Sequence, residues 1–242
     1  MEAKQIYANY KSEDFLVWKT LFGRQMNNLE GNICGEYLNA LETIGFTEER
    51  IPNFDEIDSI LASRTGWSLT VVSNIAPLRD FFGYLSQKKF TATTWLRKMS
   101  QLDYIEEPDM FHDVFGHVPL LANKSYTDFF RGLADIALEH LDHPVALEHL
   151  GRIYWFTIEF GLISEEDKMK IYGAGIISSF GETRHCLTEN VEILPFDISR
   201  MVNTPYRNDL IQDKYFVIDS YQQLYQSLPD IRKEIERIAL IR

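Results

Sequence analysis

The chain reads Phe111-His112-Asp113-Val114-Phe115-Gly116-His117-Val118-Pro119-Leu120-Leu121 in the stretch that decides its fold and its chemistry. A second stretch follows further along: Tyr154-Trp155-Phe156-Thr157-Ile158-Glu159-Phe160-Gly161-Leu162. Together they place two histidines, His112 and His117, and one carboxylate, Glu159, among apolar and aromatic residues. Ionisable side chains seldom occur in such surroundings without a partner. We therefore expect these three side chains to lie together in the folded protein.

Two imidazoles and one carboxylate form the ligand set of mononuclear non-haem Fe(II) sites, which leave coordination positions open on the opposite face. A structural zinc site would want four ligands, usually including cysteines. The only cysteines are Cys34 and Cys186, far apart and without a Cys-x-x-Cys spacing. The His-Glu-x-x-His spacing of zinc proteases is absent, but zinc bound by two histidines and one glutamate, as in a hydrolase, remains an alternative. Taken singly, either histidine could be a hydrogen-bonded core residue.

The spacing of the two histidines needs an explanation. His112 and His117 are five residues apart, which separates them by about 140° around an ideal α-helix. The sequence predicts a helix that starts after Glu106-Glu107-Pro108-Asp109, weakens at Gly116 and stops before Pro119. Such a break would let His117 turn towards the metal.

Helical periodicity dominates the rest of the chain. Apolar residues at spacings of three and four mark helices near residues 15–26, 34–41 and 57–61, and a capping box at Ser125 opens a helix that ends before Pro144. A longer helix is predicted from Val145 to about Ile163, carrying Glu159. Strand signals are confined to 67–75 and 214–219. The fold class is therefore mostly α with a few short β-strands, in one domain without repeats or linkers.

Composition excludes several functions. The chain has 242 residues and a net charge of -12, without a basic run, so nucleic acid and anionic membrane surfaces are not expected as partners. Its start has no apolar signal-peptide segment, and no apolar stretch approaches membrane-spanning length. Two cysteines without a disulfide framework fit a reducing compartment. We expect a cytoplasmic protein.

Three long sequence motifs carry a family resemblance. They are Glu107-Pro108-Asp109 leading into His112 and Gly116–Leu120, then Tyr154–Leu162, then Tyr172-Gly173-Ala174-Gly175-Ile176-Ile177-Ser178-Ser179-Phe180-Gly181-Glu182. Between about residues 14 and 228 the chain resembles the catalytic domain of the pterin-dependent aromatic amino acid hydroxylases. It is most similar to the bacterial members that act on phenylalanine.

The resemblance implies a single catalytic domain of this hydroxylase type over residues 1–242, without the family's regulatory domain or tetramerisation tail. The last helix, in residues 229–240, is too short for an autonomous coiled coil. A monomer is therefore expected.

The resemblance also implies the chemistry. His112, His117 and Glu159 would bind Fe(II), the second cofactor would be tetrahydrobiopterin or a related tetrahydropterin, and L-phenylalanine and O2 would be converted to L-tyrosine. The alternatives are the same chemistry on tryptophan or tyrosine, and a metal-binding or pterin-binding module without turnover.

Further residues follow from the same resemblance. Arg97 matches the arginine that binds the substrate carboxylate, for which a guanidinium fork is well suited, and Asp109 matches the acid that holds this arginine. Ser178 and Glu182 would support a metal ligand, and Phe81 would stack on the pterin. The other residues expected along the path of the amino acid are Ile105, Trp155, Phe160, Gly175, Ser178 and Ser179. The other residues expected around the pterin are Asn74, Ala76, Leu78 and Asp113.

His140, His143 and His149 form a second group of histidines. Their surroundings are polar and their spacing is irregular around a predicted helix break. We expect them to lie at the solvated surface and to hold no metal.

Overall fold

The structure is a computed structural model that describes residues 3–103 and 105–240. Helices account for most of the ordered backbone. In chain order the α-helices of the described residues are α1 (Ser12–Leu29), α2 (Gly35–Ile44), α3 (Phe54–Arg64), α4 (Leu78–Ser86), α5 (Lys124–Glu139), α6 (Pro144–Tyr154), α7 (Ala174–Ser178), α8 (Phe180–His185), α9 (Ile198–Asn203), α10 (Tyr221–Gln226) and α11 (Leu228–Ala239). Short 3-10 turns occur at η1 (Tyr7–Asn9), η2 (Met99–Gln101) and η4 (Pro119–Ala122), and π-helical turns at η3 (Phe111–His117) and η5 (Trp155–Glu159).

The strands form two small sheets. β1 (Ser68–Val71) and β2 (Lys89–Ala92) pair in parallel, with Leu69 opposite Phe90. The second sheet has the strand order β4-β3-β6-β5. Its strands are β3 (Gly161–Glu165), β4 (Lys168–Ile171), β5 (Glu192–Pro195) and β6 (Lys214–Ile218). β3 runs antiparallel to β4 and parallel to β6, and β5 is also parallel to β6.

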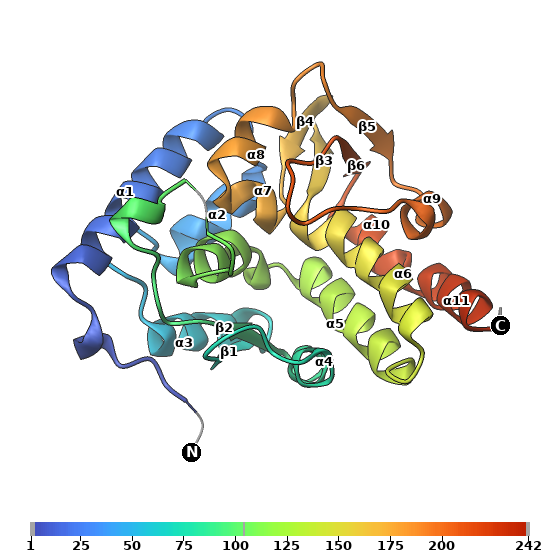
Figure 1. The fold of residues 1–242 in the computed structure, drawn as a ribbon, viewed down its shortest axis with the longest axis horizontal. Helices are drawn as coiled ribbons and strands as arrows, with labels where there is room; N and C mark the ends of the chain where they lie inside the picture. The colour runs from blue at the N-terminus through green and yellow to red at the C-terminus, as the bar shows by residue number, and fades with distance from the viewer. Residues whose placement is uncertain (1–2, 104, 241–242) are drawn as a thin grey trace.

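The two sheets lie on different sides of the helical centre (Figure 1). The pair β1–β2 lies with α3 and α4, whereas the four-stranded sheet lies beside α7, α8 and α9. Between these groups run η3 and the helices α5 and α6. Each segment that carries a candidate metal ligand is therefore central: η3 packs on α7 and β2, and η5 leads directly into β3.

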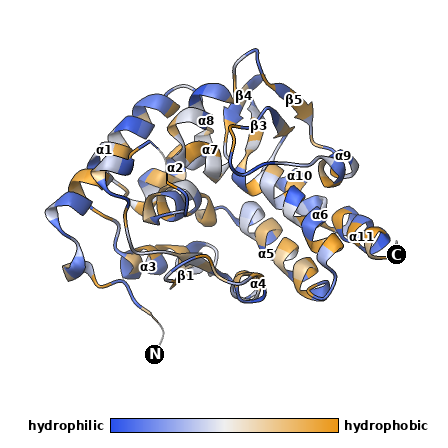
Figure 2. Cartoon of the chain, in the orientation of Figure 1, coloured by the Kyte–Doolittle hydropathy of each residue, from blue (hydrophilic) through white to orange (hydrophobic). Residues whose placement is uncertain are grey.

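The core is continuous and rich in aromatic rings. Hydrophobic and hydrophilic residues alternate along α1 and α11 in the manner of helices with one apolar face (Figure 2). The apolar face of α1 includes Trp18 and Leu21, both fully buried. Gln25, on the same helix, is buried as well, and its Nε2 donates to the carbonyl of Ile177 at 2.6 Å and to Oγ1 of Thr183 at 3.1 Å. The first long helix is thus hydrogen-bonded to α7 and α8.

The predicted fold class is confirmed, with mostly helical structure and few short strands. Both predicted strand regions contain a strand, β1 and β6, but β2 to β5 were not predicted. The helix at Ser125 is present as α5, although Asn123 rather than Ser125 caps it, accepting from the N–H of Tyr126 at 2.9 Å. The helix predicted from Val145 to Ile163 was too long: helical structure ends at Glu159, and Gly161 already begins β3.

Candidate active site

Both segments that carry candidate metal ligands are π-helical. His112 and His117 lie on η3, and Glu159 is the last residue of η5. A π-helix places residues i and i+5 nearly above one another, because its hydrogen bonds run from i+5 to i, and such turns occur frequently at functional sites. The expected weakening at Gly116 was therefore wrong, although the turn ends at His117, before Pro119, as predicted. The chain stays helical through Gly116, and the wider turn brings the two histidines together.

The three donor atoms converge. His117 Nε2 lies 3.2 Å from Glu159 Oε1 and 3.4 Å from His112 Nε2, and His112 Nε2 lies 3.8 Å from Glu159 Oε2. A metal about 2.1 Å from three ligands at right angles would hold them about 3 Å apart. The observed separations, two of which end on different carboxylate oxygens of Glu159, are slightly wider. Among the described residues this is the one group of three His, Cys, Asp or Glu side chains with that potential.

Ser178 fixes the orientation of His112. Its hydroxyl donates to the carbonyl of Ala174 at 2.9 Å, so its oxygen is free to accept from His112 Nδ1 at 2.8 Å. Nδ1 then carries the proton and Nε2 presents its lone pair to the metal position. His117 has no such anchor among the described residues, and its ring packs against Phe90 with centroids 4.9 Å apart.

The protonation states suit a metal. Burial lowers the pKa of His112 to about 4, so its imidazole is neutral near pH 7. Burial acts to raise the pKa of Glu159, but attraction to His117 and His112 and a hydrogen bond from Tyr154 outweigh it and lower the pKa to about 2. A neutral imidazole and an ionised carboxylate are the forms that bind metal.

Arg97 and Asp109 form a buried, bidentate ion pair. Arg97 Nε donates to Asp109 Oδ2 and Nη2 donates to Oδ1, both at 2.9 Å, and the backbone N–H of Arg97 also donates to Oδ2 at 2.9 Å. Asp109 is fully buried and accepts a further bond from the backbone N–H of His112 at 3.2 Å. The arginine is therefore rigid and tied to the metal-binding turn. Its Nη1 has only a long contact, 3.4 Å, with the carbonyl of Leu102.

Aromatic rings form a wall on either side of Glu159 in the sequence. The ring centroids of Trp155 and Phe160 lie 4.5 Å apart. Tyr206 stacks on Trp155, with ring centroids 4.2 Å apart and an interplanar angle of 15°. Gly175 has to be glycine here, because a Cβ would come within 2.8 Å of Phe160 Cζ. The structure thus brings together Trp155, Phe160 and Gly175. Tyr206 was not among the predicted site residues, and its stacking on Trp155 adds it to this wall.

A buried glutamine connects this wall to Glu182. The indole N–H of Trp155 donates to Gln212 Oε1 at 3.0 Å, and the backbone N–H of Gln212 donates to Glu182 Oε1 at 2.9 Å. Tyr215 donates its hydroxyl to Glu182 Oε2 at 2.5 Å. Ser179, expected near the substrate, caps α8 by accepting from the N–H of Glu182 at 3.3 Å. Glu182 and Ser179 therefore support the framework of the wall.

A cavity of about 260 Å³ opens beside the metal position. Asp113 contributes to it, with Oδ2 accepting from the N–H and hydroxyl of Thr93 at 2.8 and 2.9 Å. Tyr154 also contributes, and its ring lies 6.1 Å from that of Phe81. All five residues predicted around the pterin line this cavity, together with the three metal-ligand candidates: Asn74, Ala76, Leu78, Phe81, Asp113, His112, His117 and Glu159. Ile105, predicted near the amino acid, is half-buried in the loop before η3 and is not part of this lining.

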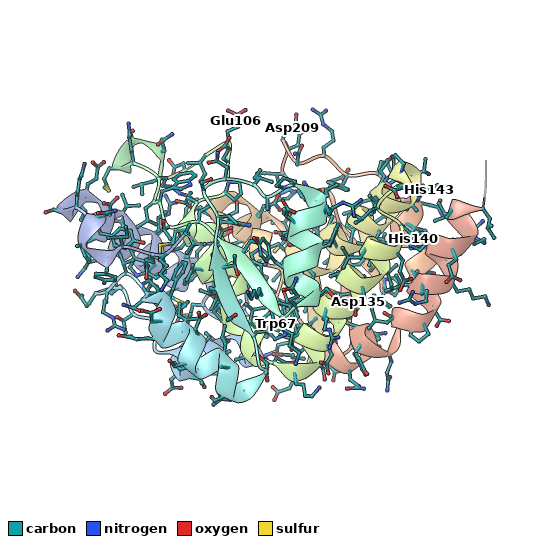
Figure 3. The ribbon with its side chains drawn as sticks, turned by 90° about the horizontal axis from the view of Figure 1, so that it is seen from below. Trp67, Glu106, Asp135, His140, His143 and Asp209 are labelled. Atoms are coloured by element: carbon teal, nitrogen blue, oxygen red, sulfur yellow. The ribbon has the colours of Figure 1, made fainter. Side chains whose placement is uncertain are left out.

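The second group of histidines belongs to helix ends. His140 ends α5 and His143 caps α6, where its Nδ1 accepts from the N–H of Ala146 at 3.1 Å. Figure 3 shows both near one end of the molecule. His149 Nδ1 instead contacts the carbonyl of Val202. All three rings are half-buried, hold local structure and do not converge on a common point.

The family model for biopterin-dependent aromatic amino acid hydroxylases matches residues 3–242. The chain belongs to this family. It is 42% identical over 221 residues to phenylalanine-4-hydroxylase from Chromobacterium violaceum, an alignment that covers 90% of the chain and 73% of that relative.

Solved structures agree. The structure of the Chromobacterium violaceum phenylalanine hydroxylase with bound Fe(III) superposes with a TM-score of 0.94 at 40% identity, covering 100% of this chain and 88% of the other. Its structure with iron(III) and the oxidised cofactor 7,8-dihydrobiopterin gives 0.91 at 39% identity, covering 98% and 86%. No helix in the described residues is long and apolar enough to cross a membrane.

Proposed function

We propose that the protein is an iron- and tetrahydropterin-dependent monooxygenase that converts L-phenylalanine to L-tyrosine with O2. The observation that carries the proposal is the convergence of His112, His117 and Glu159 within 4.8 Å beside a cavity. Relatives named phenylalanine-4-hydroxylase, at about 40% identity over most of the chain, support the substrate. Family membership removes the reason for the zinc-hydrolase alternative.

Each part of the site has a task in this reaction. His112, His117 and Glu159 would hold the iron, and their shared side would leave its other positions open. When bound there, iron and tetrahydropterin would supply the redox chemistry that activates O2, and the oxygen atom that enters the ring would come from O2. The protein contributes alignment and the exclusion of water.

Arg97 would bind the substrate carboxylate. Asp109 neutralises the charge of the Arg97 guanidinium and fixes its plane. The guanidinium therefore loses little conformational entropy when it binds a carboxylate. Trp155 and Phe160 would line the aromatic ring of the substrate, with Gly175 leaving room for Phe160. An apolar wall favours the phenyl ring of phenylalanine over the phenol of tyrosine, which needs a hydrogen-bond partner when buried.

The pterin would lie in the cavity lined by Phe81 and Asp113. Phe81 offers an aromatic face for a flat heterocycle, and Asn74, Ile75, Ala76 and Leu78 also line the cavity. Ser178 would keep His112 oriented while substrate and pterin exchange. Glu182 and Ser179 would act on the substrate wall through Gln212 and α8.

The experiment that tests the proposal is a tyrosine assay with Fe(II), tetrahydropterin and O2. We expect tyrosine formation to require all three, and O2 consumption with reduced pterin to rise when phenylalanine is added. Alanine at His112, His117 or Glu159 should remove most bound iron and essentially all hydroxylation. Loss of a ligand should lower metal affinity by more than the roughly 10 to 100-fold seen when a residue that only supports a ligand is replaced. Full activity in any of these variants would refute the metal assignment.

Competition among phenylalanine, tryptophan and tyrosine tests the substrate. We expect the catalytic efficiency to be highest for phenylalanine, since discrimination is a ratio of kcat/KM values. A preference for another amino acid would change the substrate but not the iron and pterin chemistry. Metal and pterin binding without any turnover would instead indicate a binding module.

The assembly and location are also proposed: one catalytic domain over residues 1–242, monomeric and cytoplasmic. The monomer is supported by α11, whose apolar residues Ile231, Ile235 and Ile238 are buried within the chain. The location is supported by Cys34 and Cys186, which are buried free thiols. Cell fractionation followed by the tyrosine assay would test the location.

A further inference from the structure

The carbonyl of Phe115 lacks a normal helical partner. It lies in η3 between the two histidines, three residues after His112 and two before His117. In a continuing α-helix the N–H four residues later would bond to it, but that residue is Pro119, which has no N–H. Carbonyls in the last turn of a helix need partners from elsewhere.

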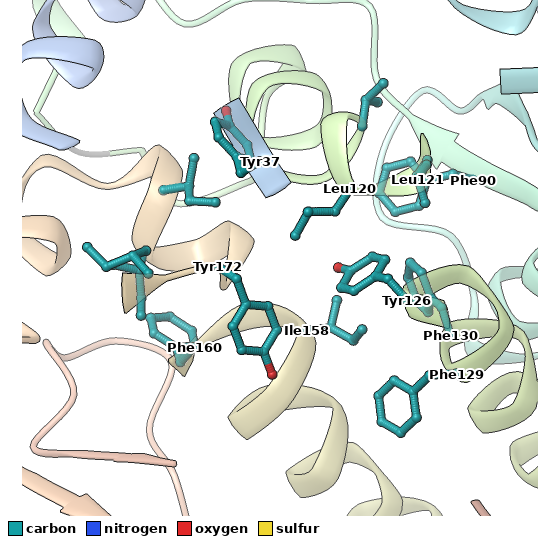
Figure 4. Close-up of a cluster of buried hydrophobic side chains, with 14 of the residues drawn as sticks. Tyr37, Phe90, Leu120, Leu121, Tyr126, Phe129, Phe130, Ile158, Phe160 and Tyr172 are labelled. Carbon is teal, nitrogen blue, oxygen red and sulfur yellow. The ribbon is translucent and has the colours of Figure 1, made fainter. Parts of the chain in front are cut away.

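Tyr37 supplies the partner. Its side chain comes from α2, is fully buried, and its hydroxyl donates to the Phe115 carbonyl at 2.6 Å. The ring of Tyr37 also packs edge-on against the ring of Phe115, with centroids 6.0 Å apart and an interplanar angle of 74°. Figure 4 shows Tyr37 beside the segment that continues into Leu120 and Leu121.

We propose that Tyr37 is a positioning residue for the metal centre: its hydroxyl holds the end of the π-helical turn so that His117 stays next to His112. Without the hydroxyl, the Phe115 carbonyl is left buried and unpaired, which is unfavourable. The backbone between the histidines can relieve this only by moving. A shift there separates the Nε2 atoms, now 3.4 Å apart, and weakens metal binding.

Tyr126 provides a matched control within the same core. It is as fully buried as Tyr37, but its hydroxyl has no hydrogen-bond partner among the described residues. Both rings are visible in Figure 4. Replacing either residue by Phe removes one buried oxygen, so the two variants differ mainly in whether a hydrogen bond to the π-helical turn is lost.

The test is a titration of metal-free wild type, Tyr37→Phe and Tyr126→Phe with Co(II) alone, followed by the visible absorption of the bound ion. We expect Tyr37→Phe to bind Co(II) about 10 to 100-fold more weakly, as found when groups that orient metal ligands are removed. Its Co(II) absorption should also change, because the ligand geometry changes. Tyr126→Phe should bind within about twofold of wild type, since it breaks no such bond. Saturating Fe(II) should restore much of the hydroxylation by Tyr37→Phe.

Equal Co(II) affinity in Tyr37→Phe and wild type would overturn the proposal. An equal loss in Tyr126→Phe would overturn it too, because the effect would then follow from any change in the buried tyrosines. Failure of Tyr37→Phe to fold, judged by circular dichroism of the metal-free protein, would show that the bond serves the whole fold instead. The inference rests on the proposed metal centre, and wild type that binds no Co(II) would count against that centre rather than against Tyr37.

Discussion

Some side chains at this site are held by several hydrogen bonds, and Arg97 is one of them. Its backbone and side chain both bond to Asp109, which in turn bonds to the backbone of His112. The residue expected to bind substrate and the residue expected to bind iron therefore share one buried carboxylate. A change at Arg97 should therefore affect substrate binding more than metal binding, because the backbone of His112 keeps its own bond to Asp109.

Arg97→Lys should raise the KM for phenylalanine by at least about tenfold while iron content stays normal, since lysine keeps the charge but loses the planar fork. Steady-state kinetics and metal analysis would check this. Arg24→Lys is a suitable control. Arg24 also bonds to a carboxylate, that of Asp103 at 2.6 Å, and to the carbonyl of Leu102, but Asp103 is exposed. Loss of iron with an unchanged KM in Arg97→Lys would mean that the role assigned to Arg97 is wrong.

Asp113 leads to a pH prediction. Burial raises its pKa to about 6, against hydrogen bonds from Thr93 that act to lower it. A carboxyl group with a raised folded pKa stabilises the protein fully below its unfolded pKa and loses that contribution as the pH rises through the folded value. In Asp113→Asn this loss is absent. The free energy of unfolding of the metal-free variant, relative to wild type, should therefore rise by up to about 3 kcal/mol between about pH 4 and pH 6.

Urea unfolding of both metal-free proteins at several pH values would measure this difference. Comparing the two proteins matters, because burial shifts the pKa of His112 in the opposite direction, to about 4, and its contribution grows over a similar pH range. The two effects oppose one another in wild type. A difference between wild type and Asp113→Asn that does not change with pH would show that Asp113 is ionised in the folded protein.

At the scale of elements, the two π-helical turns explain what the sequence could and could not predict. The candidate ligands His112, His117 and Glu159 could be singled out because polar groups stood in apolar surroundings and because the motifs around them resemble a family that binds iron there. The way they meet was not, because a π-turn is set by packing and not by local propensity. Three neighbours fix η3: Ala174 against Gly116, Ser178 against His112 and Tyr37 against Phe115. All of them come from other elements.

The strands likewise include some that the sequence predicts and others that depend on contacts with distant segments. β1 and β6 have β-branched and aromatic residues in short runs and were predicted. β4, Lys-Met-Lys-Ile, is only four residues long and half polar. It is a strand because it pairs with β3 around the turn at Glu166 and Asp167, both with positive φ. Such strands depend on a partner and leave little signal of their own. Tyr206 and Gln212 escaped prediction for a similar reason, because their contacts cross between distant segments.

Gly116→Ala tests the contact between η3 and α7. A Cβ at this position would lie 2.9 Å from the carbonyl oxygen of Ala174, and backbone cannot move aside as a flexible side chain can. We expect weaker iron binding and a free energy of unfolding lowered by about 1–3 kcal/mol. Gly83→Ala, in α4, is the control: a Cβ there meets nothing within 4 Å and should stabilise the helix by roughly 0.5–1 kcal/mol. Iron titration and urea unfolding would report both, and normal iron affinity in Gly116→Ala would contradict the tight fit.

At the scale of the whole molecule, the packing of α11 bears on the proposed monomer. Its apolar side packs on α5, α6 and α9 of the same chain. We expect light scattering at micromolar concentration to give a mass near 28.3 kDa, that of one chain. Ile235→Asp should lower the free energy of unfolding without altering that mass, because it buries a charge in the core. A stable tetramer in wild type would show that other surfaces join the chains.

The bonds from Gln25 to α7 and α8 have a consequence for how the protein is made. Their acceptors lie 152 and 158 positions later in the chain. During synthesis, Gln25 must therefore wait for most of the sequence before its acceptors are present, and contacts of such separation slow folding. Ser178, which orients His112, belongs to the same late region. In refolding experiments, the capacity to bind metal should therefore return only after α1 has docked on α7 and α8.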